Sequence, residues 1–176
     1  MTMQPQAVAQ ADRTDSGRPA RTLVVYYSRT GTTRAVAEAI AERLEGDVEE
    51  LIDTRKRKGP WGFLVAIRDA TKKRMSPIRP VQKRPADYDL VVVGTPVWAS
   101  TMSSAVRAYL TDCAAEIRKV ALFCTQAGKS PGHTFADMEE LCGRPPVATL
   151  SLRAKLVKAG QFAPMVDEFA EKLRQG

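Results

Sequence analysis

The sequence lacks a long apolar run. No part of the 176 residues approaches the roughly 18 consecutive apolar residues that a membrane-spanning helix needs. Residues 1–21 are rich in Gln, Ala, Asp, Ser and Pro and hold no apolar core of the kind found in secretory signals. We therefore interpret 1–21 as a disordered N-terminal tail, 22–176 as one domain, and the cytoplasm as the compartment.

Cysteine and histidine are scarce. The three cysteines (Cys113, Cys124 and Cys142) are an odd number without a Cys-x-x-Cys pair, and His133 is the only histidine. This composition argues against a disulfide scaffold and against a zinc site, so we expect no metal. Cys124 ends an apolar segment, where a cysteine is more often a small core residue than a redox group. His133 lies in a polar turn, where solvation is more common than a proton-donor role.

Two common nucleotide-binding signatures are absent. The sequence contains neither GxxxxGK[ST] nor GxGxxG, which argues against a nucleoside triphosphatase. A phosphoacceptor receiver domain needs an acidic pair after its first strand and an Asp after its third. The chain has Tyr27-Ser28 and Gly94-Thr95 at those places, so we reject that class as well.

Positive charge is confined to one part of the chain. The net charge is +7, yet residues 55–84 hold eleven Lys or Arg residues against one acid, Asp69. That segment therefore carries +10, and the rest of the chain carries −3. One basic patch on a mildly acidic body suits an acidic partner, an anionic membrane surface or nucleic acid. No RNA-binding signature or interleaved aromatic pattern supports nucleic acid.

Strand-like and helix-like segments alternate along the chain. Short β-branched or alternating runs predict strands over 22–27, 47–52, 90–94, 120–124 and 147–152. Apolar residues at helical spacing predict helices around 36–44, 61–67, 106–113, 134–142 and 165–173. Strand followed by helix five times predicts an α/β fold, with a parallel sheet covered on both faces.

The stretch from residue 53 to residue 87 is the least regular. Gly59-Pro60 breaks the chain and can start a helix at Trp61. We expect that helix to have an apolar side formed by Trp61, Leu64, Val65 and Ile67. An extended linker is expected to follow, marked by Pro77, Pro80 and Pro85.

Polar loops follow three of the predicted strands, over 28–33, 95–101 and 125–132. Ligands of such sheets bind at the carboxyl ends of the strands, where these loops lie. The first loop has four hydroxyls and opens onto a helix N-terminus, which suits a monophosphate better than a pyrophosphate. It equally suits an N-capping turn without a ligand. Trp98 of the second loop would either stack on a planar ligand or cover the edge of the core.

The three loop sequences together resemble the flavodoxin family. Ser28-Arg-Thr-Gly-Thr-Thr33 is similar to the phosphate loop, Gly94-Thr-Pro-Val-Trp-Ala99 to the loop whose aromatic residue stacks on the flavin, and Thr125-Gln-Ala-Gly128 to the loop at the pyrimidine end of the ring. The resemblance covers about residues 22–175, and it is to the short-chain form of the family. It implies a flavodoxin-like three-layer sandwich, a five-stranded parallel sheet of order 2-1-3-4-5, bound FMN and electron transfer.

The resemblance also implies which residues bind FMN, and it assigns no catalytic residue. The phosphate would be held by Ser28, Thr30, Gly31, Thr32 and Thr33, with Arg29 facing either the phosphate or solvent. Trp98 would stack on one ring face, and the ring would be edged by Thr95, Pro96, Val97 and Ala99. Backbone N–H groups near N1 and O2 would come from Thr125, Gln126, Ala127 and Gly128.

Two departures separate this chain from an ordinary flavodoxin. The third loop has no aromatic residue (Phe135 is the nearest), which leaves one flavin face open, and the chain is basic where flavodoxins are acidic. We expect an electron carrier with an acidic redox partner protein, or an FMN-dependent NAD(P)H or quinone oxidoreductase. A docking module without catalytic activity is the alternative from another class. The basic body predicts a less negative flavin potential than in acidic flavodoxins.

Overall fold

The computed structural model describes residues 20–55, 59–128 and 130–176. Residues 1–19 of the tail expected over 1–21 lie outside the described residues, as does the basic run 56–58. Arg21 is tied to the domain by its backbone. Its N–H donates to Asp89 Oδ2 at 2.8 Å, and its carbonyl accepts from the Asp89 N–H at 2.9 Å.

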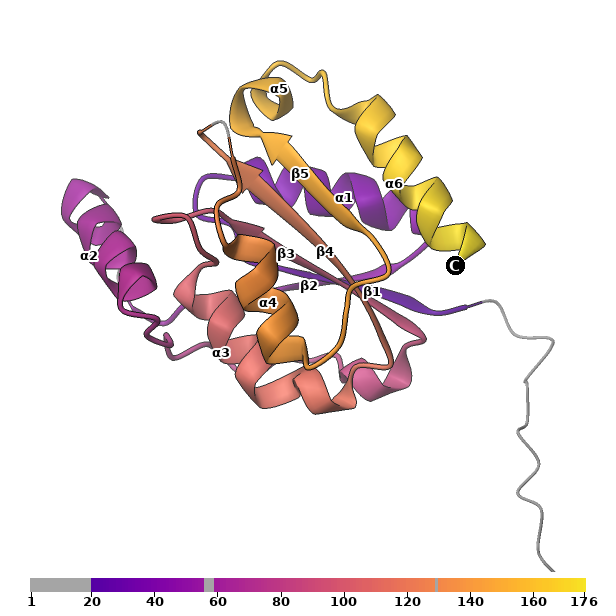
Figure 1. The fold of residues 1–176 in the computed structure, drawn as a ribbon, viewed down its shortest axis with the longest axis horizontal. Coiled ribbons are helices and arrows are strands. Elements are labelled where there is room, and N and C mark those ends of the chain that lie inside the picture. Colours follow the sequence, from indigo (N-terminus) through magenta and orange to yellow (C-terminus); the bar gives the residue numbers. More distant parts are fainter. Residues whose placement is uncertain (1–19, 56–58, 129) are drawn as a thin grey trace, which may run out of the picture.

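Five parallel strands form one sheet in the order β2-β1-β3-β4-β5, as the sequence predicts (Figure 1). The three inner strands are almost completely buried, which is why their sequences are continuous apolar runs. The strand order reverses between β1 and β3, so a ligand is expected at the carboxyl ends of these strands. The strands are β1 (Thr22–Tyr26), β2 (Asp47–Glu50), β3 (Leu90–Pro96), β4 (Lys119–Gln126) and β5 (Thr149–Arg153).

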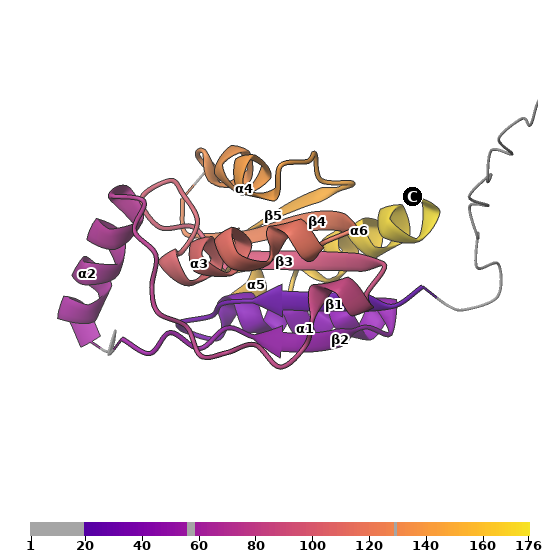
Figure 2. The ribbon, with the colours of Figure 1, turned by 90° about the horizontal axis from the view of Figure 1, so that it is seen from below.

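Helices cover both faces of the sheet. One face carries α1 (Thr32–Leu44), α5 (Ala154–Lys158) and α6 (Ala163–Gln175). The other face carries α3 (Ser104–Cys113) and α4 (Thr134–Cys142). The remaining elements are α2 (Gly59–Thr71) and two 3₁₀ turns, η1 (Pro85–Asp87) and η2 (Ala114–Glu116). Figures 1 and 2 show α2 at one end of the molecule, beside α3.

Side chains of each strand alternate between the two faces, and both faces are packed. In β1, Leu23 and Val25 join the cluster under α3 and α4, while Val24 joins the cluster under α1 and α6. Ile40 of α1 and Tyr109 of α3 have no exposed surface. This double burial fixes the register of the sheet, and with it the relative positions of the loops at the carboxyl ends.

Several element ends differ from the predictions. The strand expected over 90–94 continues to Pro96, and the one over 120–124 continues to Gln126, because pairing with the neighbouring strand extends that far. The second loop therefore begins at Val97. The two outer strands are shorter than expected, since 47–52 ends at Glu50 and 147–152 begins at Thr149.

The helix expected from Trp61 forms as α2, but two of its expected apolar residues remain exposed. Leu64 exposes 56% of its surface and Val65 exposes 37%, whereas Asp69 and Ala70 are buried. The linker that follows is also less extended than expected. Pro85 begins the turn η1, because proline suits the first position of a helical turn.

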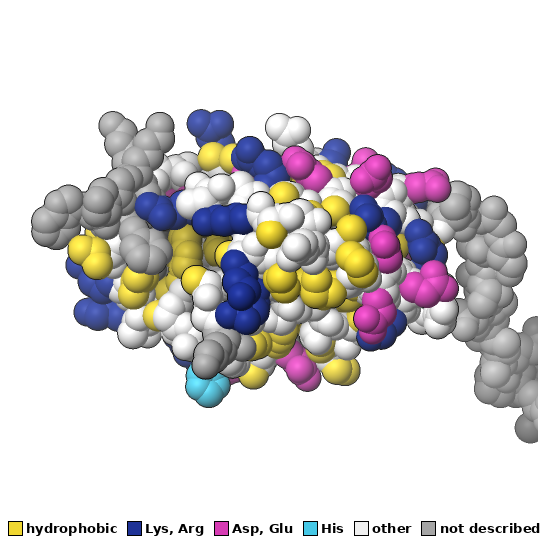
Figure 3. All heavy atoms as spheres, turned by 90° about the horizontal axis from the view of Figure 1, so that it is seen from above, with side chains coloured by type: hydrophobic (Ala, Val, Ile, Leu, Met, Phe, Trp, Pro, Cys, Tyr) yellow, Lys and Arg dark blue, Asp and Glu magenta, His cyan; other side chains and the backbone are white. Residues whose placement is uncertain are grey.

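Charge is unevenly distributed over the surface. On the face seen in Figure 3, Asp and Glu side chains gather toward the end opposite α2. Lys and Arg side chains lie together with hydrophobic side chains at the α2 end. Lys and Arg side chains also lie along the rest of this face, so the asymmetry seen there is mainly one of acidic side chains.

Candidate functional site

A cavity of about 210 Å³ lies where the three polar loops meet, at the carboxyl ends of the strands. Eleven of the fifteen residues predicted to bind a cofactor line it: Arg29, Thr30, Thr32, Thr33, Pro96, Val97, Trp98, Ala99, Thr125, Gln126 and Ala127. The sequence reasoning missed Ile67 of α2 and Ala154 of α5, which also line the cavity. Neither residue belongs to a polar loop, so only the three-dimensional arrangement reveals them.

The first loop leads directly into the N-terminus of α1. Gly31 is the residue before the helix and has a φ of 86°, a left-handed conformation that glycine adopts at little cost. Ser28 Oγ accepts a hydrogen bond from the Gly31 N–H at 3.1 Å and so closes the turn. The N–H groups of the first helical turn have no carbonyl partner within the helix, and they carry the positive end of its dipole. An anion at this end of the cavity is therefore stabilised.

The second loop is a tight reversal that seats Trp98 against the core. The backbones of Trp98 and Thr101 exchange two hydrogen bonds of 2.9 and 3.0 Å. Between them Ala99 and Ser100 have φ values of 49° and 64°, which cost free energy for residues other than glycine. The Trp98 ring is 7% exposed and meets the Tyr27 ring edge-on, with ring centroids 5.5 Å apart. Trp98 therefore covers the edge of the core and lines the cavity at the same time.

A buried polar cluster lies beneath this reversal. Arg107 of α3 is 7% exposed and donates to Thr101 Oγ1 at 3.1 Å. The Thr101 hydroxyl in turn donates to Asp137 Oδ2 of α4, and Lys73 Nζ lies 3.2 Å from Asp137 Oδ1. Burial alone would raise the pKa of Asp137. The hydrogen bonds from Thr101 and Lys73, with the charges of Lys73 and Arg107, outweigh burial and lower that pKa. The carboxylate is therefore held ionised beneath the loop.

The third loop is bonded to the first and to β5. The hydroxyls of Thr33 and Thr125 share a buried hydrogen bond of 2.8 Å. Gln126 is buried, and its Nε2 donates to Ser151 Oγ at 3.0 Å. Its Oε1 is buried without a hydrogen-bond partner among the described residues. A cavity-lining residue with an unpaired acceptor suits a ligand that brings an N–H donor.

Four of the predicted binding residues do not line the cavity. Ser28 and Gly31 shape the first loop, and Gly128 is exposed beyond the third. Thr95 is fully buried, and its Oγ1 accepts from the Ser103 N–H at 3.0 Å at the start of α3. Thr95 therefore positions α3, and any effect on the cavity is indirect.

Other residues considered in the sequence lie outside the cavity. Cys124 is buried, and burial raises the pKa of its thiol to about 11. Phe135 packs against the core cluster under α3 and α4. His133 is exposed, and its backbone N–H donates to the Ser100 carbonyl at 2.8 Å. Gly132 touches the same turn so closely that a Cβ there would lie 2.4 Å from Ser100 Cβ.

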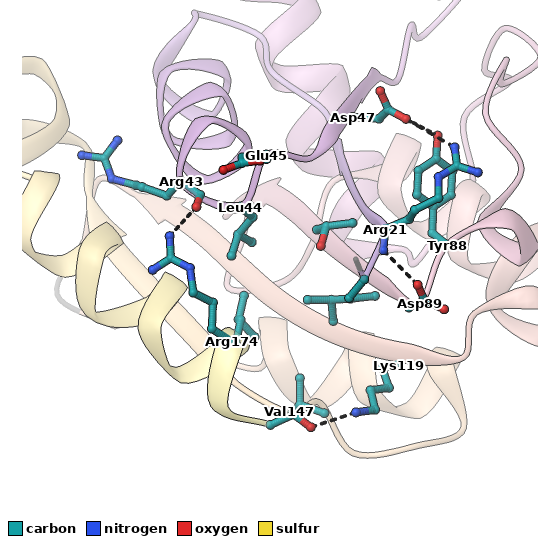
Figure 4. A pocket seen from close by; sticks show the side chains of 15 residues that line it. Arg21, Arg43, Leu44, Glu45, Asp47, Tyr88, Asp89, Lys119, Val147 and Arg174 are labelled. Atoms are coloured by element: carbon teal, nitrogen blue, oxygen red, sulfur yellow. Dashed lines mark hydrogen bonds and ion pairs between the residues drawn. The ribbon is translucent and has the colours of Figure 1, made fainter. Parts of the chain in front are cut away.

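A larger cavity of about 560 Å³ lies at the opposite, amino ends of the strands (Figure 4). Two of its cations are bonded within it: Arg21 lies 3.7 Å from Asp47, and Lys119 Nζ donates to the Gly176 carbonyl at 2.8 Å. Ala20, the first described residue, also lines it. Since ligands of open parallel sheets bind at the carboxyl ends, we take the smaller cavity as the candidate site.

The described residues hold neither a metal-binding cluster nor a membrane-spanning helix. No group of three or more His, Cys, Asp or Glu side chains there is arranged to hold a metal ion. Within the same residues, none of the helices combines the length and apolar character needed to cross a membrane.

Comparison with known proteins identifies relatives of this fold. A family model described as flavodoxin matches residues 21–159. No curated protein matches the chain. A solved flavoprotein from Lactobacillus acidophilus, in complex with FMN, is similar with a TM-score of 0.66 and 20% identity, over 80% of this chain and 97% of that chain.

Two further structures carry the name flavodoxin. The two-electron reduced flavodoxin of Megasphaera elsdenii has a TM-score of 0.54 and 20% identity, over 85% of this chain and 98% of that chain. The oxidised flavodoxin 2 of Bacillus cereus has a TM-score of 0.56 and 15% identity, over 89% and 99%. At these identities the structures show a shared fold alone. The family model matches most of the chain, and the fold agrees with it, so this protein belongs to the flavodoxin family.

Proposed function

We propose that the chain binds FMN in the cavity formed by its three loops and transfers electrons through it. The observation that carries this proposal is the position of that cavity, over the N-terminus of α1 and at the switch point of the sheet. Family membership supports a flavin, and the FMN complex of the Lactobacillus acidophilus flavoprotein supports FMN in particular.

The residues at the two ends of the cavity fit the two ends of FMN. The phosphate would bind at the first turn of α1, among the hydroxyls of Thr30, Thr32 and Thr33. The flavin ring would lie toward Trp98 and the third loop, where the unpaired Oε1 of Gln126 suits the ring N–H. Bound FMN would supply the redox chemistry, while the chain would bind it, orient it and exclude water.

A second candidate is an FMN-dependent oxidoreductase acting on NAD(P)H or a quinone. The observation in its favour is the small size of the cavity residues that the third loop and α5 contribute. Ala127 and Ala154 line the cavity beside the third loop, while the nearest aromatic, Phe135, packs into the core. Small side chains there would leave room for a substrate over one face of the ring. The carrier remains our first choice, because the three loops match those of electron-carrying flavodoxins.

The test is a fluorescence titration of the purified protein with FMN and with riboflavin, which lacks the phosphate. We expect FMN to bind roughly tenfold tighter or more for each charge-assisted hydrogen bond to its phosphate. Thr32→Val should weaken FMN and leave riboflavin unchanged. Thr149→Val, at the far end of β5, is the matched control. Equal affinity for the two flavins would place the phosphate outside the α1 turn, and no binding of either would reject the proposal.

Stepwise anaerobic reduction of the FMN-loaded protein then separates the two candidates. A carrier should take up electrons one at a time, with an intermediate visible spectrum between the oxidised and reduced forms. An oxidoreductase should bleach directly on addition of NADH or NADPH, and an added quinone, which takes the electrons from the reduced flavin, should restore the colour. Direct bleaching would replace our first choice with the second candidate.

A further inference from the structure

Exposed apolar side chains are concentrated around α2. In the described part of the chain, five large hydrophobic residues are exposed, and four of them lie in or beside the excursion between β2 and β3: Ile52, Leu64, Val65 and Met75. The fifth, Val147, lies at the amino ends of the strands. Exposed apolar groups gathered in one region mark an interaction surface, whereas single scattered ones do not.

Positive charge surrounds the same helix. Arg68 lies four residues after Leu64 and three after Val65, so it shares the exposed side of α2 with them. Lys72 comes directly after the last residue of α2 and is also exposed. Lys73 and Arg74 follow directly, and both side chains are more than half exposed. Apolar and cationic side chains therefore reach solvent together at this end of the molecule, as Figure 3 shows.

The local acids do not neutralise these cations. The buried carboxylate of Asp69 is shared by three arginines, with Arg55 at 3.0 Å, Arg68 at 3.8 Å and Arg74 at 3.9 Å. A second nearby acid, Asp53, accepts from the Arg55 N–H at 2.8 Å, and Asp137 pairs with Lys73. Asp53 and Asp69 against the three arginines leave an excess of one positive charge. Lys72 adds to that excess, so the α2 end keeps a net positive charge in the folded protein.

We propose that the exposed side of α2 docks the protein on an anionic lipid surface. A helix that presents both apolar and cationic side chains on a protruding edge can insert the apolar groups at the acyl boundary while the cations meet the head groups. An acidic protein partner would account for the cations alone. It would leave the exposed side chains of Leu64 and Val65 without a role.

Docking by α2 would also bring the cofactor cavity to the lipid. Ile67 lines that cavity, while Leu64, one turn earlier on the same helix, is exposed. The cavity therefore lies directly beside the proposed docking surface. The docking itself does not depend on FMN, so the two proposals can fail separately.

The experiment is flotation of the purified full-length protein with vesicles of phosphatidylcholine alone and of phosphatidylcholine mixed with phosphatidylglycerol. We expect the protein to float with the anionic vesicles only, and less at high salt because the attraction is screened. The double variant Leu64→Gln/Val65→Gln should lower vesicle binding by about tenfold or more, from the loss of two buried apolar groups. The double variant Arg68→Glu/Lys72→Glu should lower it at least as much.

Matched controls separate docking from general stickiness or misfolding. Val147→Gln and Lys158→Glu change an exposed apolar and an exposed cationic residue elsewhere, and both should float like the unchanged protein. All variants should keep the circular dichroism of the unchanged protein, and the glutamine variant, which alters no charge, should also keep its affinity for FMN. The proposal is overturned if the unchanged protein does not bind anionic vesicles, or if the glutamine variant binds them as well as the unchanged protein does. Salt-sensitive binding to polyglutamate without vesicle binding would identify an acidic protein as the partner instead.

Discussion

Asp137 shows how much a single side chain contributes to the shape of the loop that carries Trp98. It contacts Thr101 of the Trp98 reversal, Arg107 of α3 and Lys73 after α2. Asp137→Asn would leave the buried guanidinium of Arg107 without its counter-charge, at a cost of roughly 3 kcal/mol in the free energy of unfolding near neutral pH. Urea unfolding followed by circular dichroism measures this loss. Glu140→Gln, an exposed change on the same helix, is the control and should be almost neutral.

The stability effect of Asp137→Asn should depend on pH. The pKa of Asp137 is lowered in the folded state, so its carboxylate contributes stability above the ordinary value of 3.8. That contribution is lost as the pH falls from there through the folded pKa. The stability difference between the unchanged protein and Asp137→Asn should therefore shrink in that acidic range. A difference that stays constant down to the acid transition would show that the ionised carboxylate is not the source.

The cysteines differ in predicted reactivity. Burial raises the pKa of Cys124 and of Cys142 to about 11. It raises the pKa of Cys113 as well, but this side chain is partly exposed while the other two are buried. Only the thiolate is nucleophilic, so alkylation of the folded protein at mildly alkaline pH should modify Cys113 first and the other two slowly. Timed iodoacetamide pulses with peptide mass mapping measure the order, and the urea-unfolded protein gives the uninhibited rates. Rapid labelling of Cys124 would reopen a redox role for it.

The residues of the site differ in how far the sequence reveals them. Thr30, Thr32 and Trp98 were found because a polar or aromatic loop after an apolar strand is a local pattern. The partners of Asp137 come from three separate elements, and no local pattern joins them. Ile67 was assigned to an apolar side of its helix, and only the fold places it in the cavity.

At the scale of elements, β3 and β4 are locked together at Gly94. Gly94 of β3 pairs with Phe123 of β4 across the sheet, and a Cβ on Gly94 would lie 2.0 Å from Phe123 Cζ. Gly94→Ala should therefore destabilise the protein by about 1–3 kcal/mol through overpacking. Adding Phe123→Leu should recover part of that loss, so the double variant should be more stable than the two single losses predict. Thermal unfolding measures all three variants.

Gly128→Ala is the control for this pair. A Cβ there meets nothing within 4 Å, and the change should leave the melting temperature almost unaltered. If Gly94→Ala behaved like this control, the contact with Phe123 would be looser than the structure indicates. If Phe123→Leu gave no rescue, the ring would not be the cause of the loss.

The elements that could be predicted from the sequence are those buried on both sides. The inner strands are continuous apolar runs, so their existence and order could be predicted, while their ends depend on pairing with neighbours. The helix α2 shows the opposite case. Periodicity identified apolar residues on it, but whether another element covers them is decided by the whole fold, which leaves Leu64 and Val65 exposed. The five-residue helix α5 is too short to show a period.

At the scale of the whole molecule, charge is arranged with respect to the candidate site. The net charge is +7, and the segment 55–84, which carries +10 against −3 for the rest of the chain, includes α2 at the edge of the cavity. The acidic side chains in view lie toward the opposite end (Figure 3). A flavin bound in the cavity would therefore experience a positive potential, unlike one in an acidic flavodoxin.

This arrangement predicts the reduction potential of the bound flavin. Positive charge stabilises the anionic reduced flavin, so the midpoint potential should be less negative than in an acidic flavodoxin measured in parallel. Added salt screens exposed charges over distances beyond about 10 Å at 0.1 M, so the potential should become more negative as salt rises. Spectroelectrochemical titration across a salt series measures both effects, and Lys72→Gln should reproduce part of the salt effect at low salt. A very negative potential, or one that rises with salt, would show that contacts inside the cavity outweigh the field of the basic segment.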